Sequence, residues 1–331
     1  MSVGKDFKTL LATPDKPWVE ICGRWLMDGT MVLLFGARGC GKSTIALALA
    51  QAVASRSRFM LPDWVPSRAY RAIYFDSEMG SDAMKVKLRE VDSAAQNSLS
   101  QNNFRIVDAD DMGGKAWRLS DPEDQRKIIE AVADYDFIVF DNYLGMSARM
   151  HRGDDDESVW KRSEELLLAL RKSGRTVILV HHSGKSGDQL GTSMKENPMD
   201  TVIKIEEWID DEISGLQMNM FFTKHRWVVD RHEVRPLRLI FQKLETRQSW
   251  TAMTIKEAKV EFAHRKVKNG WTKADTAKFL GLSKSQFQEL LKSSVYEQAS
   301  LFNDGGTNNG SNGHTEKAKD YLRDEAEDFY S

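Results

Sequence analysis

The sequence is poor in several features that would assign it to a specialised class of protein. It contains only two cysteines, Cys22 and Cys40, which are too few for a disulfide framework or a cysteine-rich metal centre. Its longest apolar stretches have the length of a strand, and residues 1–10 contain neither a basic region nor an apolar run. We therefore expect no membrane span and no secretion signal, and a cytoplasmic location is the default.

The chain also lacks a strong net charge of either sign. Its 47 Lys and Arg residues nearly balance its 49 Asp and Glu residues, so the formal net charge is −2 at pH 7. No global basic field attracts nucleic acid, and any contact with DNA must come from local patches.

What the sequence does contain is a regular alternation of apolar runs with helical stretches. Strand-like runs occur at 31–35, 71–75, 104–107, 137–140 and 176–180, and residues 81–96 and 158–173 have the pattern of helices. Consecutive strand-like runs then follow at 201–205, 216–225 and 234–244. The pattern predicts an α/β fold with a mostly parallel central sheet, helices on both faces and antiparallel additions at one edge.

Changes in composition divide the chain into three parts. The α/β domain is assigned to residues 1–250, with a short N-terminal extension, and its strand pattern is expected to end near Thr246. Residues 255–300 are helical and more basic. Residues 301–331 combine a Gly/Asn/Ser-rich linker with an acidic tail, which is either solvated or a docking peptide for a replication partner protein.

A phosphate-binding loop lies between the first strand and the first core helix. Its residues are Gly36, Ala37, Arg38, Gly39, Cys40, Gly41, Lys42, Ser43 and Thr44. Glycines let backbone N–H groups surround phosphates, Lys42 neutralises the β and γ oxygens, and Ser43 ligates Mg²⁺. We expect Mg²⁺ and ATP as ligands, although this loop does not read the base. Cys40 is either a small spacer or a thiol activated by the helix terminus.

Two carboxylates at strand ends are candidates for the chemistry of hydrolysis. Asp141 ends the strand 137–141, where a carboxylate reaches the Mg²⁺ shell. The following Asn142 stands where AAA+ ATPases carry a glutamate base, so another carboxylate must polarise the attacking water. Glu78 is the candidate, because its strand end is expected beside the nucleotide.

The order of these motifs resembles that of RecA-like hexameric helicases. The phosphate loop, Ser77–Met79, the Asp141 strand and residues 177–187 match DnaB-like and plasmid RepA-like P-loop ATPases, of the AAA_25 type, over about residues 20–245. The resemblance implies that Glu78 is the catalytic base. It also implies a γ-phosphate sensor at His182, with His181 as the alternative.

The same resemblance suggests an oligomer. Lys224 and Arg226 form a Lys-x-Arg pair at a strand end, which looks like the pair of cations that reaches the nucleotide of the next subunit in DnaB-type rings. A solvated basic strand end is the alternative interpretation. If the pair acts in trans, the active form is a ring or a filament, and a hexameric ring is expected.

Three segments are candidates for contacts with DNA. Arg149 and Arg152 lie in the loop 142–158, and Lys185 and Lys195 lie in the loop 183–197. The loops at these places in RecA-like motors face a central channel, where they would grip single-stranded DNA through its phosphates. Residues 272–294 fit a helix-turn-helix whose second helix presents Lys284, Ser285 and Gln286, although a protein-binding helical hairpin has the same pattern.

The sequence therefore predicts an ATP-hydrolysing DNA helicase or translocase, acting in replication of a plasmid, phage or mobile element. The alternative is an ATP-dependent DNA-binding regulator or recombination factor that does not unwind DNA. A small-molecule kinase shares the phosphate loop, but it explains neither the C-terminal helices nor the pair Lys224 and Arg226, which is called the finger pair below.

Overall fold

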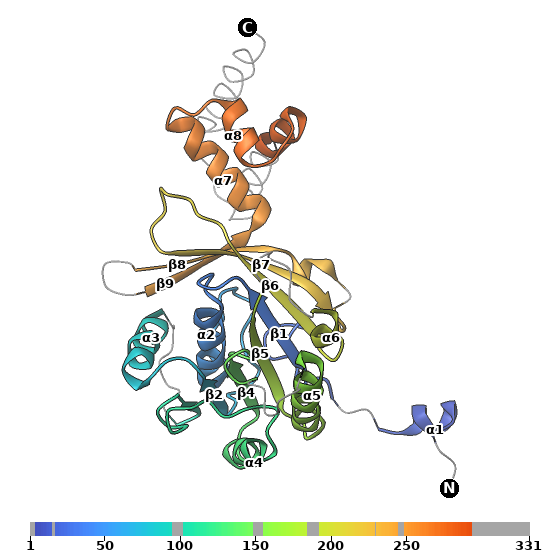
Figure 1. The fold of residues 1–331 in the computed structure, drawn as a ribbon. Coiled ribbons are helices and arrows are strands. Elements are labelled where there is room, and N and C mark those ends of the chain that lie inside the picture. The colour runs from blue at the N-terminus through green and yellow to red at the C-terminus, as the bar shows by residue number, and fades with distance from the viewer. Residues whose placement is uncertain are drawn as a thin grey trace, which may run out of the picture. The chain divides into compact units, whose positions relative to one another are not determined.

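The computed structural model describes residues 4–14, 17–94, 102–147, 155–183, 192–228, 230–243 and 248–292. The chain divides into two compact units, Met1–Ile255 and Lys256–Ser331 (Figure 1). The predicted DNA contacts Arg149, Arg152 and Lys185, and the predicted acidic tail, lie outside the described residues.

A nine-stranded sheet forms the centre of the first unit, in the order β3-β2-β4-β5-β1-β6-β7-β8-β9. Its parallel strands are β1 (Met31–Gly36), β2 (Ala72–Asp76), β3 (Phe104–Val107), β4 (Phe137–Asp141), β5 (Thr176–His182) and β6 (Thr201–Glu207). Strands β7 (Leu216–His225), β8 (Leu237–Lys243) and β9 (Gln248–Thr254) continue it in antiparallel fashion. This confirms the predicted α/β fold with antiparallel edge additions. The run 201–205, which was expected among those additions, is instead β6, and it is parallel to β1.

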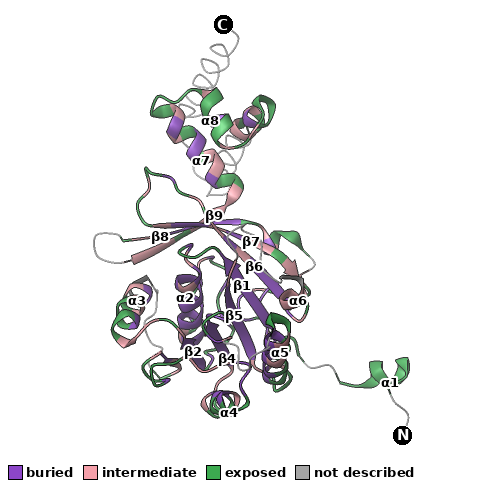
Figure 2. Ribbon diagram, viewed as in Figure 1, coloured by how far each residue is buried: buried purple, intermediate pink, exposed green. Residues whose placement is uncertain are grey.

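Helices cover the two faces of this sheet. The first core contains α2 (Lys42–Ser55) and the buried side of α3 (Ser81–Ala94). The second contains residues of α4 (Pro122–Ala131) and α5 (Asp156–Lys172). Twelve of the fourteen residues of α2 are buried, so this helix is held by core packing on all sides (Figure 2). The phosphate loop thus leads into the most enclosed helix of the unit.

The remaining elements are short. Helix α1 (Phe7–Ala12) is capped by Asp6, helix α6 (Thr192–Glu196) precedes β6, and the 3-10 helix η1 (Arg231–Val234) precedes β8. Asp155 caps α5 by accepting a hydrogen bond from the Ser158 N–H at 2.8 Å. Asp155 and the two carboxylates that follow it, Asp156 and Glu157, therefore lie at the start of this helix.

The structure corrects two details of the sequence analysis. The strands of the ATPase core do not end near Thr246, because β9 pairs with β8 along its whole length up to Thr254. Strand β8 begins at Leu237 and not at Val234, because η1 occupies residues 231–234 and Pro236 has no N–H to donate to a neighbouring strand.

The second unit is helical where it is described. Helix α7 (Ile255–Lys268) is followed by α8 (Lys273–Phe279) and by helical residues 284–292. Ala263, Ala277 and Phe287 form its small core, and Gly281 takes a φ of +65° in the turn between the last two helices. A small residue at 277, a glycine in the turn and an apolar anchor at 287 are typical of a helix-turn-helix. Over both units, none of the described helices combines the length and the apolar composition that crossing a bilayer requires.

Candidate functional site

The phosphate loop connects the buried strand β1 to α2, and two of its glycines are required by their surroundings. A Cβ atom at Gly36 would collide with the carbonyl oxygen of Ile205 on β6. Gly41 precedes the first residue of α2 with a φ of +96°, and a Cβ there would meet the side chains of Met218 and Leu216 on β7. The loop is therefore shaped by its packing against β6 and β7.

Lys42 is buried and folds back over its own loop. Its ammonium donates to the Ala37 carbonyl oxygen at 2.5 Å and lies 3.8 Å from Cys40 Sγ. Burial lowers the pKa of Lys42. Burial also raises the pKa of the Cys40 thiol in spite of the nearby Lys42, so Cys40 is a buried spacer and not an activated thiol.

The carboxylates at the ends of β2 and β4 are neighbours in the sheet, because Asp76 pairs with Asp141 in register. Burial raises the pKa of Asp141, and hydrogen bonds from Tyr74 and Ser43 and the charge of Lys42 act against this shift. Asp141 is thus a buried carboxylate in contact with the hydroxyl group that the loop offers to a metal ion.

Asp76 was not singled out in the sequence, and it is the second buried carboxylate at this edge. Its Oδ1 accepts the N–H groups of Glu78 at 2.8 Å and Met79 at 2.9 Å. Its Oδ2 is buried and has no hydrogen-bond partner among the described residues. Burial raises the pKa of Asp76 to about 6. Asp76 therefore fixes the turn that carries Glu78 and leaves one oxygen available.

Glu78 and His182 meet through Asn142. The Asn142 amide nitrogen donates to Glu78 Oε1 at 2.8 Å and lies 3.1 Å from His182 Nε2. The Glu78 side chain is 58% exposed, whereas that of His182 is 14% exposed. Burial and the Lys42 charge lower the pKa of His182, so the ring is neutral at pH 7. The predicted base Glu78 and the predicted sensor His182 thus lie together. They are joined by Asn142, which the sequence singled out only because AAA+ ATPases carry a glutamate at that place.

His181 points away from this group, although it is the next residue. Burial and Lys195 lower its pKa to about 3. The Lys195 ammonium lies 3.2 Å from His181 Nε2 and 5.0 Å from the centre of the Tyr143 ring. Lys195, predicted to contact DNA, is therefore half-buried against the end of β5. The geometry favours His182 over His181 as the residue that faces the nucleotide.

Lys224 and Arg226 lie outside the pocket of their own chain. Lys224 Nζ donates to the carbonyl oxygens of Glu196 at 2.6 Å and Asn197 at 3.1 Å. Arg226 donates to the Asn197 carbonyl oxygen at 2.8 Å and to the buried carboxylate of Asp200 at 3.4 Å. Both cations therefore hold the segment that follows α6.

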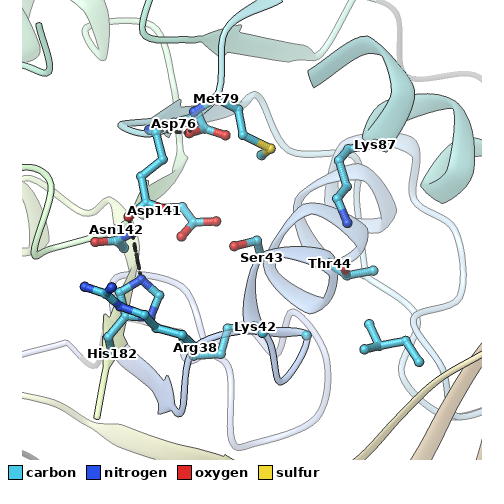
Figure 3. Close-up of a pocket in the computed structure, with 14 residues that line it drawn as sticks. Arg38, Lys42, Ser43, Thr44, Asp76, Met79, Lys87, Asp141, Asn142 and His182 are labelled. Carbon is cyan, nitrogen blue, oxygen red and sulfur yellow. Dashed lines mark hydrogen bonds and ion pairs between the residues drawn. The ribbon is translucent and has the colours of Figure 1, made fainter. Parts of the chain in front are cut away.

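The predicted site residues line one pocket together with others that the sequence analysis gave no role (Figure 3). Those predicted are Arg38, Gly39, Gly41, Lys42, Ser43, Thr44, Glu78, Asp141 and His182. Those without an assigned role are Asp76, Met79, Lys87, Asn142 and Leu216. Lys87 comes from α3 and lies across the pocket from Asp141 and Asn142 in Figure 3. The sequence offered one indication of a role for Asp76, which is that it is a carboxylate at the end of a strand, two residues before Glu78.

Residues 5–188 match the AAA domain family AAA_25. The chain belongs to this family. Its fold is that of RecA-like P-loop ATPases, and its membership implies ATP binding and an ATPase activity.

Two solved structures are similar to about two thirds of this chain. One is a KaiC-like protein from the hyperthermophilic archaeon Pyrococcus horikoshii OT3, with 18% identity, a TM-score of 0.46, and coverage of 68% of this chain and 90% of that one. The other is the flagellar accessory protein FlaH from Methanocaldococcus jannaschii, with 11% identity, a TM-score of 0.44, and coverage of 67% and 89%. No curated protein matches the chain.

The donor set of this AAA_25 pocket fits a hydrated Mg²⁺ ion beside nucleotide phosphates. Ser43 supplies a hydroxyl group, Asp141 a carboxylate, and Asp76 a buried oxygen without a partner. Hard oxygen ligands of this kind, completed by water and phosphate, are those that Mg²⁺ prefers.

Proposed function

We propose that this chain is an oligomeric DNA-stimulated ATPase that moves along single-stranded DNA as a helicase or translocase, in the replication of a plasmid, phage or mobile element. One observation carries the proposal. The pocket combines a phosphate loop, a base and a sensor, while the finger pair Lys224 and Arg226 lies outside the pocket of its own chain. Such a pair is useful to hydrolysis only in the pocket of a neighbouring copy, so the active form is a ring, expected to be hexameric.

Each residue of the pocket is proposed to have a separate role in ATP hydrolysis. Lys42 and the loop N–H groups would hold the β and γ phosphates. Ser43 and Asp141 would hold Mg²⁺, which would neutralise the charge that develops on the phosphate. Glu78 accepts the proton of the attacking water, and its carboxylate is oriented by Asn142. His182 shares this amide, so a change at the γ-phosphate reaches the end of β5.

Residues 195–197 are proposed to connect the pocket to the DNA channel. Lys195 contacts His181, and the carbonyl oxygens that end α6 bind Lys224 and Arg226. The loops 142–158 and 183–197, with Arg149, Arg152, Lys185 and Lys195, are proposed to bind DNA phosphates. A replication partner protein is proposed to bind the acidic tail.

The first experiment measures ATP hydrolysis with and without single-stranded DNA at several protein concentrations. We expect stimulation by DNA and specific activity that rises steeply with protein concentration. Turnover that is indifferent to both would contradict the proposed motor.

A second experiment tests whether Arg226 acts in trans. We expect Arg226→Ala and Glu78→Gln each to be inactive, and a 1:1 mixture to regain activity, because about a quarter of randomly mixed interfaces pair an intact base with an intact finger. Arg171→Ala is the matched control, since Arg171 also approaches Asp200, at 3.7 Å, without belonging to the finger pair. A mixture as inactive as its components would show that Arg226 has a structural role.

The alternative function is an ATP-dependent DNA-binding regulator or recombination factor. The helix-turn-helix arrangement of α8 and residues 284–292 favours it, because such a pair of helices recognises duplex DNA. Strand displacement on a forked duplex decides between the two, since a regulator would hydrolyse ATP without separating the strands.

A further inference from the structure

The helical unit after residue 255 has a charge that the whole-chain average hides. Residues 256–292 contain nine Lys or Arg residues and four Asp or Glu residues, a surplus of five positive charges, whereas the whole chain has a formal net charge of −2. Lys268, Lys278 and Lys284 are exposed. This small unit therefore carries a local surplus of positive charge, of the kind that a chain with balanced overall charge needs in order to bind a polyanion.

Exposed aromatic rings lie within this basic unit. Phe279 is 51% exposed and Trp271 is 39% exposed, although both are large apolar side chains. Their ring centres are 5.9 Å apart with nearly perpendicular planes, and Phe279 also stacks on the buried Phe262 at 4.9 Å. The rings are therefore held in fixed positions by packing from behind while part of each remains in solvent.

The side chain of Lys266 packs against these aromatic rings. The Lys266 ammonium lies 5.1 Å from the centre of the Trp271 ring and 5.3 Å from that of Phe262. Lys266 is itself buried, so its stem supports the aromatic group from inside the unit. Trp271, Phe279 and Lys266, with exposed lysines beside them in the sequence on α7 and α8, are called the aromatic face below.

We propose that the aromatic face binds single-stranded nucleic acid, with bases stacked on Trp271 and Phe279 and phosphates held by the neighbouring lysines. Exposed rings among surplus positive charges are the combination by which proteins bind single strands without reading sequence. A duplex keeps its bases stacked inside, so it could use the lysines but not the rings. The proposal deepens the proposed function by naming a DNA contact outside the ATPase unit.

The direct test changes the ligand and leaves the protein intact. The full chain, without nucleotide, is titrated with a labelled oligothymidylate of about 12 nucleotides and with an abasic deoxyribose-phosphate strand of equal length, followed by fluorescence anisotropy. We expect the abasic strand to bind at least about tenfold more weakly, since each stacked base adds measurably to affinity. Equal binding of the two strands, or stronger binding of a duplex of the same length, overturns the proposal.

Variants then assign the binding to this face. We expect Trp271→Ala and Phe279→Ala each to weaken oligothymidylate binding by about tenfold, and Trp271→Tyr to retain most of the affinity because a tyrosine ring still stacks. Ile209→Ala is the control, since Ile209 is an equally exposed apolar residue, at 57%, in the ATPase unit. Wild-type affinity in both alanine variants would overturn the proposal. The proposal would also be overturned if the alanine variants lost binding to a partner protein while their affinity for oligothymidylate stayed unchanged.

The outcome is separable from that of the proposed motor. Binding to the aromatic face is measured without ATP, whereas the motor is measured by DNA-stimulated hydrolysis and strand displacement. A chain that binds the strand through Trp271 but whose ATPase ignores DNA would retain the aromatic face and lose the motor.

Discussion

Glu78 is oriented by a neutral amide and is more than half exposed, which suits a group that must exchange a proton with water. In Glu78→Gln the side-chain oxygen can still accept the Asn142 hydrogen bond, so the pocket keeps its shape. We expect ATP to bind with unchanged affinity and the turnover rate to fall by at least about a hundredfold. Nucleotide binding and phosphate release measure the two quantities.

The control for this variant is Asp82→Asn. Asp82 is a fully exposed carboxylate on α3, paired only with the exposed Lys85 among the described residues, and its loss should leave turnover unchanged. Substantial turnover in Glu78→Gln would remove Glu78 as the base.

Asp76 predicts a dependence of stability on pH whose sign follows from its raised pKa. The folded-state pKa of about 6 exceeds the ordinary value of 3.8, so the folded state binds the proton more tightly than the unfolded state. The resulting stabilisation is complete below pH 3.8 and is lost as the pH rises through 6. In the nucleotide-free protein, Asp76→Asn should therefore be more stable than wild type at pH 7.5, by about 3 kcal/mol.

The same substitution should lower the affinity for Mg²⁺ at neutral pH, because the unpartnered carboxylate oxygen is lost. Half-maximal ATP hydrolysis should then require a higher Mg²⁺ concentration. Thermal unfolding at pH 4.5 and pH 7.5, and a Mg²⁺ titration of ATP hydrolysis, measure both effects. A destabilised variant with unchanged Mg²⁺ dependence would show that Asp76 serves only the turn that holds Glu78.

Asn142 shows why residue-level chemistry was only partly predictable. The phosphate loop and Asp141 follow from local patterns, and Glu78 follows from the ends of adjacent strands. The partners of Asn142 lie 64 and 40 positions away in the sequence, and its role depends on side-chain positions that no spacing encodes. Met79, Lys87 and Leu216 are likewise brought to the pocket by packing.

At the scale of elements, the junction of β1 and β6 fixes the phosphate loop. A Cβ at Gly36 meets a backbone oxygen of β6, which cannot move aside as a side chain can. We expect Gly36→Ala to lower the free energy of unfolding by about 3 kcal/mol or more, or roughly 10 °C in melting temperature, and to abolish nucleotide binding.

Gly39→Ala is the comparison for that variant. Gly39 also has a positive φ, of +81°, but a Cβ there has open space around it, so its cost should be limited to about 1 kcal/mol of backbone strain. Equal destabilisation by the two substitutions would contradict a special role for the strand contact.

The buried strands were the most predictable elements. Continuous apolar runs located β1, β2, β3, β4 and β5 to within two residues of their observed bounds. Strand β9 was missed because its residues are exposed or half-buried and Ser249, Thr251 and Thr254 interrupt the apolar pattern. Helix α4 was also missed, although Asp121 and Pro122 form a usual helix start, because only Asp124 and Ile128 are buried in it.

At the scale of the whole molecule, the two units have separate hydrophobic cores, with the small one made of residues such as Ala263, Ala277 and Phe287. A chain that ends at Ile255 should therefore keep the ATPase unit folded and bind nucleotide with an affinity within about twofold of that of the full chain. Its single-stranded DNA binding should be weaker. Circular dichroism, nucleotide titration and anisotropy test the three statements, and an unfolded truncated chain would show that the ATPase unit needs the helical one.

The hydrogen bonds of Asn142 have a mechanical consequence. One nitrogen atom serves both Glu78 and His182, while the Asn142 oxygen is held by the Gly145 N–H at 3.0 Å. A rotation of the Asn142 side chain would therefore displace the nitrogen that both residues contact. The position of Glu78 is in this way mechanically coupled to that of His182, and through it to the end of β5.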